Sequence, residues 1–93
     1  MPETYRRKDS VVQRDVAGQT LLVPIQGEAA DLQRVFSLNA VGRLVWEALA
    51  TGRTEWELAV DVMENFDVDA ERASADVRAF VARLAEAGLV ERA

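Results

Sequence analysis

The stretch 34–46 constrains the fold of this chain most, because a strand pattern passes there into a helix pattern without a linker. Alternation places Val35 and Ser37 on one face and Arg34, Phe36 and Leu38 on the other, as on a half-buried pleated surface. Asn39 follows directly, and its side-chain oxygen can accept a hydrogen bond from an early helical N–H. The sequence therefore predicts a strand that is capped directly into a helix.

Two more strands are predicted before this junction. Residues 10–16 and 20–25 have strand patterns, and the turn-forming stretch 17–19 between them favours a hairpin. Pro24 has no N–H for a sheet ladder, so we expect it near a strand end or at an edge. With a third strand at 32–38, the simplest arrangement is an antiparallel meander.

Helical periodicity begins after Asn39, and we expect Gly52 to end the first helix as a left-handed glycine. Thr54 and Glu57 then have the spacing of a capping box, in which each side chain caps a backbone N–H. This pattern predicts a second helix with an acidic outer face.

The third helix is the longest pattern in the chain. Asp69 and Glu71 place negative charge at its expected N-terminus, where the helix dipole favours it. Residues 87–89 predict a Schellman ending in which Leu89 folds back onto Leu84. The apolar stripe of this helix contains Ala73, Val77, Phe80, Val81 and Leu84.

These patterns predict an α+β fold, with a three-stranded antiparallel sheet followed by three helices. Residues 1–9 are polar and charged, so we expect a disordered tail followed by a single domain over 10–93. No apolar run approaches the length of a membrane helix and no signal peptide is recognisable, so we expect a cytoplasmic protein without membrane contact.

The composition argues against several classes of function. The chain has no Cys and no His, which excludes thiolate nucleophiles, imidazole catalysis and Cys/His zinc sites. The net charge of −5 argues against nucleic-acid binding, and residues 54–71 contain no Lys or Arg. We therefore expect neither an enzyme nor a cofactor or metal protein.

Several short motifs, taken in order, resemble the PqqD-like family: residues 36–39 at the junction, Trp46, the stretch 52–54, and 84–90 at the end. The resemblance implies a winged-helix-like domain that recognises ribosomally made, post-translationally modified peptides (RiPPs). Such a RiPP recognition element binds the leader segment of a precursor peptide and delivers it to a radical-SAM enzyme, a leader peptidase or another modifying enzyme. Residues 22–28 depart from the family pattern, so the resemblance supports peptide recognition more than the quinone pathway.

The resemblance also implies where a leader would bind: at the exposed edge of the third strand and in a groove beside the third helix. Unpaired backbone groups of an edge strand can bind an extended peptide. Arg72, Arg78 and Arg83 are alternatives for an arginine that faces the groove. The candidate peptide-binding residues are Gln33, Arg34, Val35, Phe36, Ser37, Asp76, Phe80, Arg83 and Leu84.

Two other functions are compatible with the same topology. One is a winged-helix DNA-binding regulator, although the third helix has no basic stripe. The other is a structural module that pairs with its own copy through the third strand, so either a monomer or a weak homodimer is expected. Trp46 and Trp56 each remain open as core residue or interface anchor.

Overall fold

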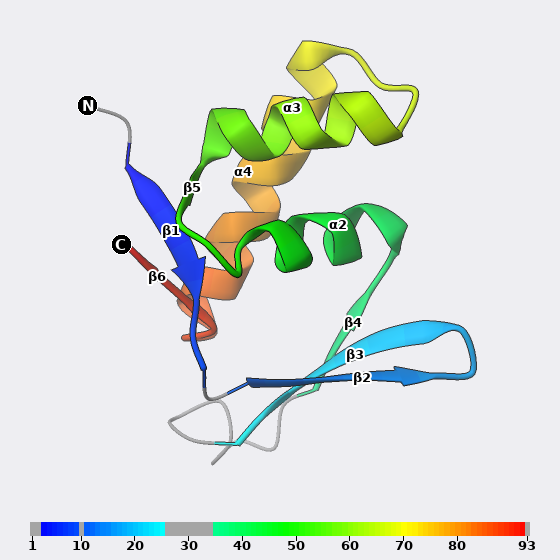
Figure 1. Ribbon diagram of the computed structural model, residues 1–93, viewed down its shortest axis with the longest axis vertical. Coiled ribbons are helices and arrows are strands. Elements are labelled where there is room, and N and C mark those ends of the chain that lie inside the picture. The colour runs from blue at the N-terminus through cyan, green and yellow to red at the C-terminus, as the bar shows by residue number, and fades with distance from the viewer. Residues whose placement is uncertain (1–2, 10, 26–34, 93) are drawn as a thin grey trace.

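The computed structural model describes residues 3–9, 11–25 and 35–92. Its first sheet contains β2 (Val11–Val16), β3 (Gln19–Pro24) and β4 (Phe36–Leu38), all antiparallel and in that spatial order. Figure 1 shows this sheet at one end of the molecule, below the helices. The hairpin, the antiparallel sheet and the three helices that follow it are confirmed.

The helices are α2 (Ala40–Ala48), α3 (Glu55–Asn65) and α4 (Ala70–Glu86). In Figure 1, α2 and α3 lie one above the other, and α4 crosses behind them toward the sheet. None of the helices in the described part of the chain is long and apolar enough to cross a membrane.

A second sheet was not expected from the sequence. β1 (Thr4–Arg7) lies between β5 (Arg53–Thr54) and β6 (Val90–Arg92) and pairs antiparallel with both (Figure 1). The N–H of Arg7 also donates to the Leu49 carbonyl, and that of Lys8 to the Leu89 carbonyl, each at 2.9 Å. The prediction of a disordered tail over 1–9 is therefore wrong for β1, because distant segments satisfy its backbone groups.

The predicted helix caps are present, with one exception. Asn39 Oδ1 accepts from the N–H of Gly42 at 2.8 Å, and Thr54 forms the reciprocal capping box that opens α3. α4 ends in a Schellman motif, in which the N–H of Leu89 donates to the Leu84 carbonyl at 2.9 Å. The exception is Gly52, because α2 already ends at Ala48 with an ordinary right-handed cap residue.

The third strand is shorter than predicted. β4 begins at Phe36, whereas the predicted strand began at residue 32; residues 32–34 lie outside the described part of the chain. β3 ends at Pro24, in agreement with the expected position of that proline near a strand end. β4 is thus a short strand that leads through Asn39 into α2.

The core lies between the helices and the inner face of the first sheet. Trp46 is 1 % exposed and belongs to the core, whereas Trp56 is 57 % exposed at the start of α3. Leu22 and Leu38 contribute the sheet side, and Leu49 caps the end of α2. The helices contribute Val45, Leu58, Ala59, Val62, Ala73, Val77, Val81 and Leu84. The buried hydroxyl of Thr20 is satisfied because it donates to Asp15 at 2.8 Å.

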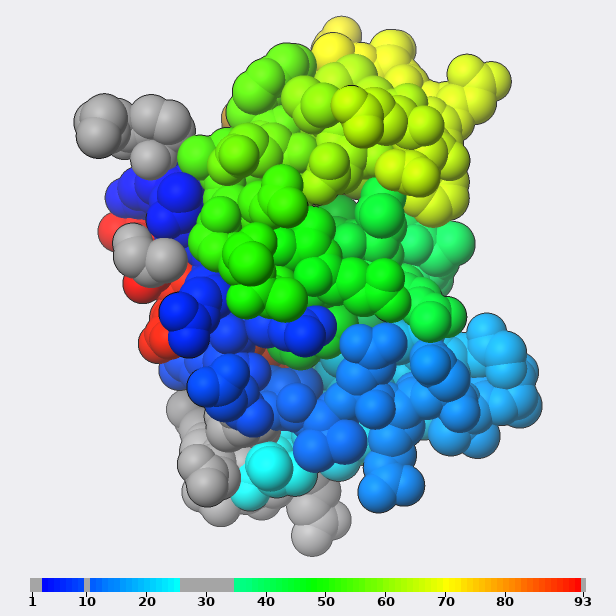
Figure 2. Space-filling model, in the orientation of Figure 1, coloured from blue at the N-terminus to red at the C-terminus, as the bar shows by residue number. Residues whose placement is uncertain are grey.

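Figure 2 shows the β2–β3 hairpin projecting beyond the helices at the lower right.

Candidate functional site

β4 is at the edge of the first sheet, because β3 is its only strand partner among the described residues. The hairpin determines which backbone groups face that edge. Val16 pairs with Gln19 across Ala17 and Gly18, whose φ angles of 51° and 82° are those of a type I′ turn. The residues that flank such a turn share its closing hydrogen bond, so Gln19 directs its backbone groups toward β2.

The backbone N–H and C=O of successive residues point alternately to the two sides of a strand. Leu22 lies three residues after Gln19, so its N–H and C=O point the opposite way, toward β4. Leu22 pairs with Phe36, which therefore directs its backbone groups back toward β3. The next residue, Ser37, presents its N–H and C=O at the outer edge. By the same alternation, the backbone groups of Val35 point to the outer edge as those of Ser37 do, and Val35 is 56 % exposed. No strand in the described part of the chain pairs with the outward groups of Ser37.

A groove lies between α2 and α4, directly beyond the end of β4. Its volume is about 470 Å³. Val41 and Phe80, which are half-buried, form its partly exposed apolar lining, together with Val68 from the segment between α3 and α4. Val45 and Val77 border the groove but are each only 1 % exposed. Asn39, which caps α2, lines the same groove. The edge of β4 and the groove are therefore contiguous at Asn39.

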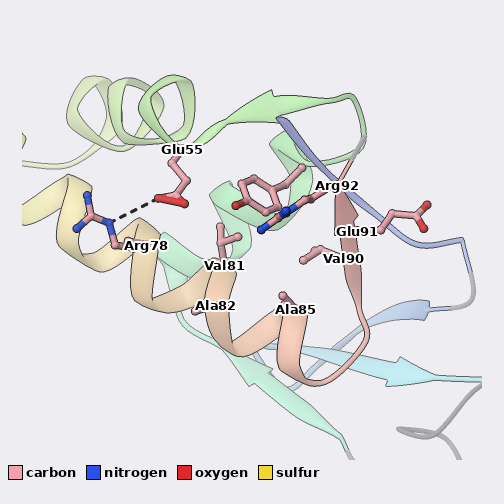
Figure 3. Close-up of a pocket in the computed structure, with 9 residues that line it drawn as sticks. Glu55, Arg78, Val81, Ala82, Ala85, Val90, Glu91 and Arg92 are labelled. Carbon is pink, nitrogen blue, oxygen red and sulfur yellow. Dashed lines mark ion pairs between the residues drawn. The ribbon is translucent and has the colours of Figure 1, made fainter. Parts of the chain in front are cut away.

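The arginines of α4 divide between two sides of the helix. Arg72 and Arg83 line the groove, whereas Arg78 lies on the other side and pairs with Glu55 of α3 at 3.7 Å. Figure 3 shows Arg78 turned toward Glu55 beside a separate hollow of about 210 Å³. Of the three arginines that the sequence left as alternatives, Arg72 and Arg83 therefore line this groove and Arg78 does not.

Within the groove, Arg72 and Asp76 neutralise one another, since Nε of Arg72 lies 3.2 Å from the Asp76 carboxylate. The Arg83 guanidinium makes no ion pair with any residue in the described part of the chain. Because both members of the Arg72–Asp76 pair are at least half exposed, the pair contributes little to stability.

The other predicted site residues are placed as follows. Ser37 is exposed at the edge, and Phe36 is half-buried and packs against the core. Phe80 is half-buried in the groove. Leu84 is 1 % exposed and belongs to the core, so it does not offer a surface for a peptide. Gln33 and Arg34 lie outside the described residues.

The α2 side of the groove was not predicted from the sequence. Val41 and Val45 are four residues apart on one helix face, and the periodicity indicated that this face packs into the core. That prediction is confirmed for Val45, but nothing in the periodicity indicated that the same face also borders a groove. No pattern in the sequence marked Gly42 as a residue of the groove. A Cβ built at Gly42 would lie 3.4 Å from Phe80 Cζ. The absence of a side chain at Gly42 therefore allows α4 to approach α2 closely.

Comparisons with known proteins agree with this architecture. The family model for coenzyme PQQ synthesis protein D (PqqD) matches residues 19–90. No curated protein matches the chain.

Three solved structures are similar over nearly the whole chain. The structure of TbiB1 in complex with the TbiA(beta) leader peptide has a TM-score of 0.75 and 27 % identity, and the match covers 92 % of this chain and 94 % of that one. Lasso peptide synthetase B1 complexed with the leader peptide has a TM-score of 0.75 and 18 % identity, with coverage of 94 % and 96 %.

The third is the solution structure of the PqqD truncation of PqqCD from Methylobacterium extorquens, which represents a functional, stand-alone RiPP recognition element. It has a TM-score of 0.73 and 21 % identity, and the match covers 96 % of this chain and 89 % of that one. The two structures below 25 % identity support the fold, and the family model covers most of the chain. This chain belongs to the PqqD family.

Proposed function

We propose that this protein binds the leader segment of a ribosomally synthesised precursor peptide. The leader adds as an extended strand to the outer edge of β4 and continues into the groove between α2 and α4. The observation that carries this proposal is the contiguity of the two surfaces, since the outward backbone groups of Ser37 precede Asn39, which lines the groove. Strand addition gives affinity through main-chain hydrogen bonds, and side-chain pockets give specificity.

Two of the structurally similar proteins support the proposal, because they are complexes with leader peptides. TbiB1 has the higher sequence identity of the two, at 27 %. The groove also has the dimensions and the mixed apolar and charged lining that suit several side chains of an extended peptide.

We further propose that the protein has no catalytic activity of its own and delivers the bound leader to a modifying enzyme, such as a radical-SAM protein or a leader peptidase. The chain has no Cys or His, and the charged groove residues in the described part of the chain are two arginines and one aspartate. This set contains no nucleophile beside a general base. Binding and presentation are the functions that such a surface supports.

A titration tests the proposal. The probe is a synthetic, fluorescein-labelled leader region of the precursor peptide that is encoded beside the gene, and fluorescence anisotropy measures its binding. We expect a dissociation constant in the micromolar range or lower, and a scrambled peptide of the same composition is the control. In ¹⁵N-labelled protein, the amide signals of Ser37 and Phe80 should shift on binding, whereas that of Trp56 should not. An equal affinity for the scrambled peptide, or no binding, would refute the proposal.

A further inference from the structure

The charge of the groove differs from that of the protein. The chain has a net charge of −5, but among the described residues the charged ones that line the groove are Arg72, Asp76 and Arg83, which sum to +1. Since Arg72 and Asp76 pair with one another, the excess positive charge is that of Arg83. A peptide that enters the groove therefore meets one guanidinium that no described residue neutralises, on an otherwise acidic protein.

An apolar surface lies one helical turn from this cation. Phe80 is half-buried, and its ring reaches the junction of β4 and α2, where it approaches Gly42. Val41, which is half-buried, lines the groove opposite it, beside the almost fully buried Val45. The exposed part of the Phe80 ring thus offers a contact for one large apolar side chain beside Arg83.

The spacing of Arg83 and Phe80 along α4 is about 2 Å shorter than the spacing of side chains on one face of an extended peptide. Arg83 and Phe80 are three residues apart, which is a rise of about 4.5 Å along the helix axis. Side chains on one face of a strand repeat every second residue, at about 6.7 Å. The long, flexible arginine side chain covers the difference of about 2 Å between these spacings. Neighbouring inward positions of a bound strand can therefore meet Arg83 and Phe80 separately.

We propose that the groove selects leader segments in which an acidic residue and a large apolar residue are separated by one residue. The acidic side chain pairs with Arg83, and the apolar side chain packs on Phe80. The next residue of the peptide that faces the groove, beyond the apolar one, lies beside the neutral Arg72–Asp76 pair. We expect this peptide residue to be polar and uncharged. This inference rests on the proposed function, because it concerns the specificity of the same site.

Arg78 provides a matched control for Arg83 on the same helix. Arg78 has the same charge and belongs to α4, but it faces Glu55 on the other side (Figure 3). Comparison of Arg83→Glu with Arg78→Glu therefore separates an effect in the groove from a general change in net charge, which both variants share.

The experiment uses the labelled leader peptide described above and its charge-reversed form, in which the acidic residue of the acidic-x-apolar pair is replaced by Lys. We expect Arg83→Glu to weaken binding of the natural leader about tenfold or more, because it places like charges together. Arg78→Glu should weaken it less than about twofold. The charge-reversed peptide should bind wild-type protein weakly and Arg83→Glu more tightly, and these differences should shrink at high salt.

The outcomes distinguish this inference from the proposed function. If the wild-type protein binds the leader but Arg83→Glu behaves like Arg78→Glu, the selectivity is refuted and leader binding stands. A tightly bound leader without an acidic-x-apolar pair refutes it as well. If the wild-type protein binds no leader, the proposed function fails, and the inference fails with it. Circular dichroism of each variant confirms that the fold is retained.

Discussion

Phe80 of α4 packs against Gly42 of α2 so closely that a Cβ built on the glycine would lie 3.4 Å from the ring and 3.3 Å from the capping oxygen of Asn39. This contact joins the end of β4, the start of α2 and the middle of α4 at one point. It therefore relates the stability of the fold to the shape of the proposed peptide groove.

Substitution of Gly42 tests this contact. Gly42→Ala gains about 1 kcal/mol of helix propensity, which the crowding offsets, so we expect a small net change in stability. Gly42→Val should lower the free energy of unfolding by about 1–3 kcal/mol, because the larger side chain overpacks the contact. Urea denaturation measures both. Ala40→Val, at an exposed position of the same helix, reports the cost of a valine without crowding. Equal losses for Ala40→Val and Gly42→Val would contradict the prediction.

Ser37→Pro tests strand addition. The N–H of Ser37 faces the outer edge, so a proline there removes a donor that the sheet does not use. We expect the variant to remain folded but to bind the labelled leader about five- to tenfold more weakly, as for loss of one hydrogen bond of about 1 kcal/mol. Ser37→Ala keeps the N–H and should bind like wild type. Wild-type affinity in a folded Ser37→Pro variant would mean that this N–H does not contact the peptide.

The hairpin turn contains a strained residue that can be improved. Ala17 has φ 51°, a left-handed conformation that alanine adopts at a cost and asparagine tolerates. Ala17→Asn should raise the free energy of unfolding by about 0.5–1 kcal/mol. Ala17→Val, with a β-branched side chain, should lower it. Thermal and urea unfolding measure the two changes, and a stabilising valine would show that the turn is of another type.

Arg7 tests the role of the N-terminal strand. Its guanidinium carbon lies 5.5 Å from the centre of the Trp46 ring, and its Nη1 donates to the Trp46 carbonyl at 3.5 Å. Arg7→Ala should lower the free energy of unfolding by about 1 kcal/mol, because it removes the cation–π contact and the packing of the side-chain stem. Arg6→Ala, at the exposed neighbouring position, should have almost no effect. A tail without fixed structure would give the same result for both.

The capping box of α3 gives a pH dependence with a defined sign. The backbone hydrogen bond from Thr54 lowers the pKa of Glu57 in the folded protein. Because the pKa is higher in the unfolded chain, this contribution to stability is present above the ordinary carboxylate pKa and is lost as the pH falls through the lowered value. Glu57→Gln should therefore reduce the loss of stability between neutral and acidic pH. Urea midpoints at a series of pH values measure this, and an unchanged pH profile would contradict it.

The elements that the sequence predicted well are those whose causes are local. The Asn39 cap, the capping box of Thr54 and the Schellman ending at Leu89 each depend on residues only a few positions apart, and all three are present. The β2–β3 hairpin also has a local cause, because its turn is formed by Ala17 and Gly18 between the paired strands. The alternation from Val35 to Leu38 likewise indicated which side chains of β4 face the core.

Tertiary structure decided what depends on distant partners. β1 has no periodic signal, and it is a strand because β5 and β6, far along the chain, satisfy its backbone groups. The rotation of α4 against α2 and α3 places Arg83 in the groove and Arg78 beside Glu55, although both lie outside the apolar stripe. The sequence thus determined the strand-to-helix junction at Asn39 by local hydrogen bonding. Only the packing of separate helices decided that a groove lies beside that junction and which side chains line it.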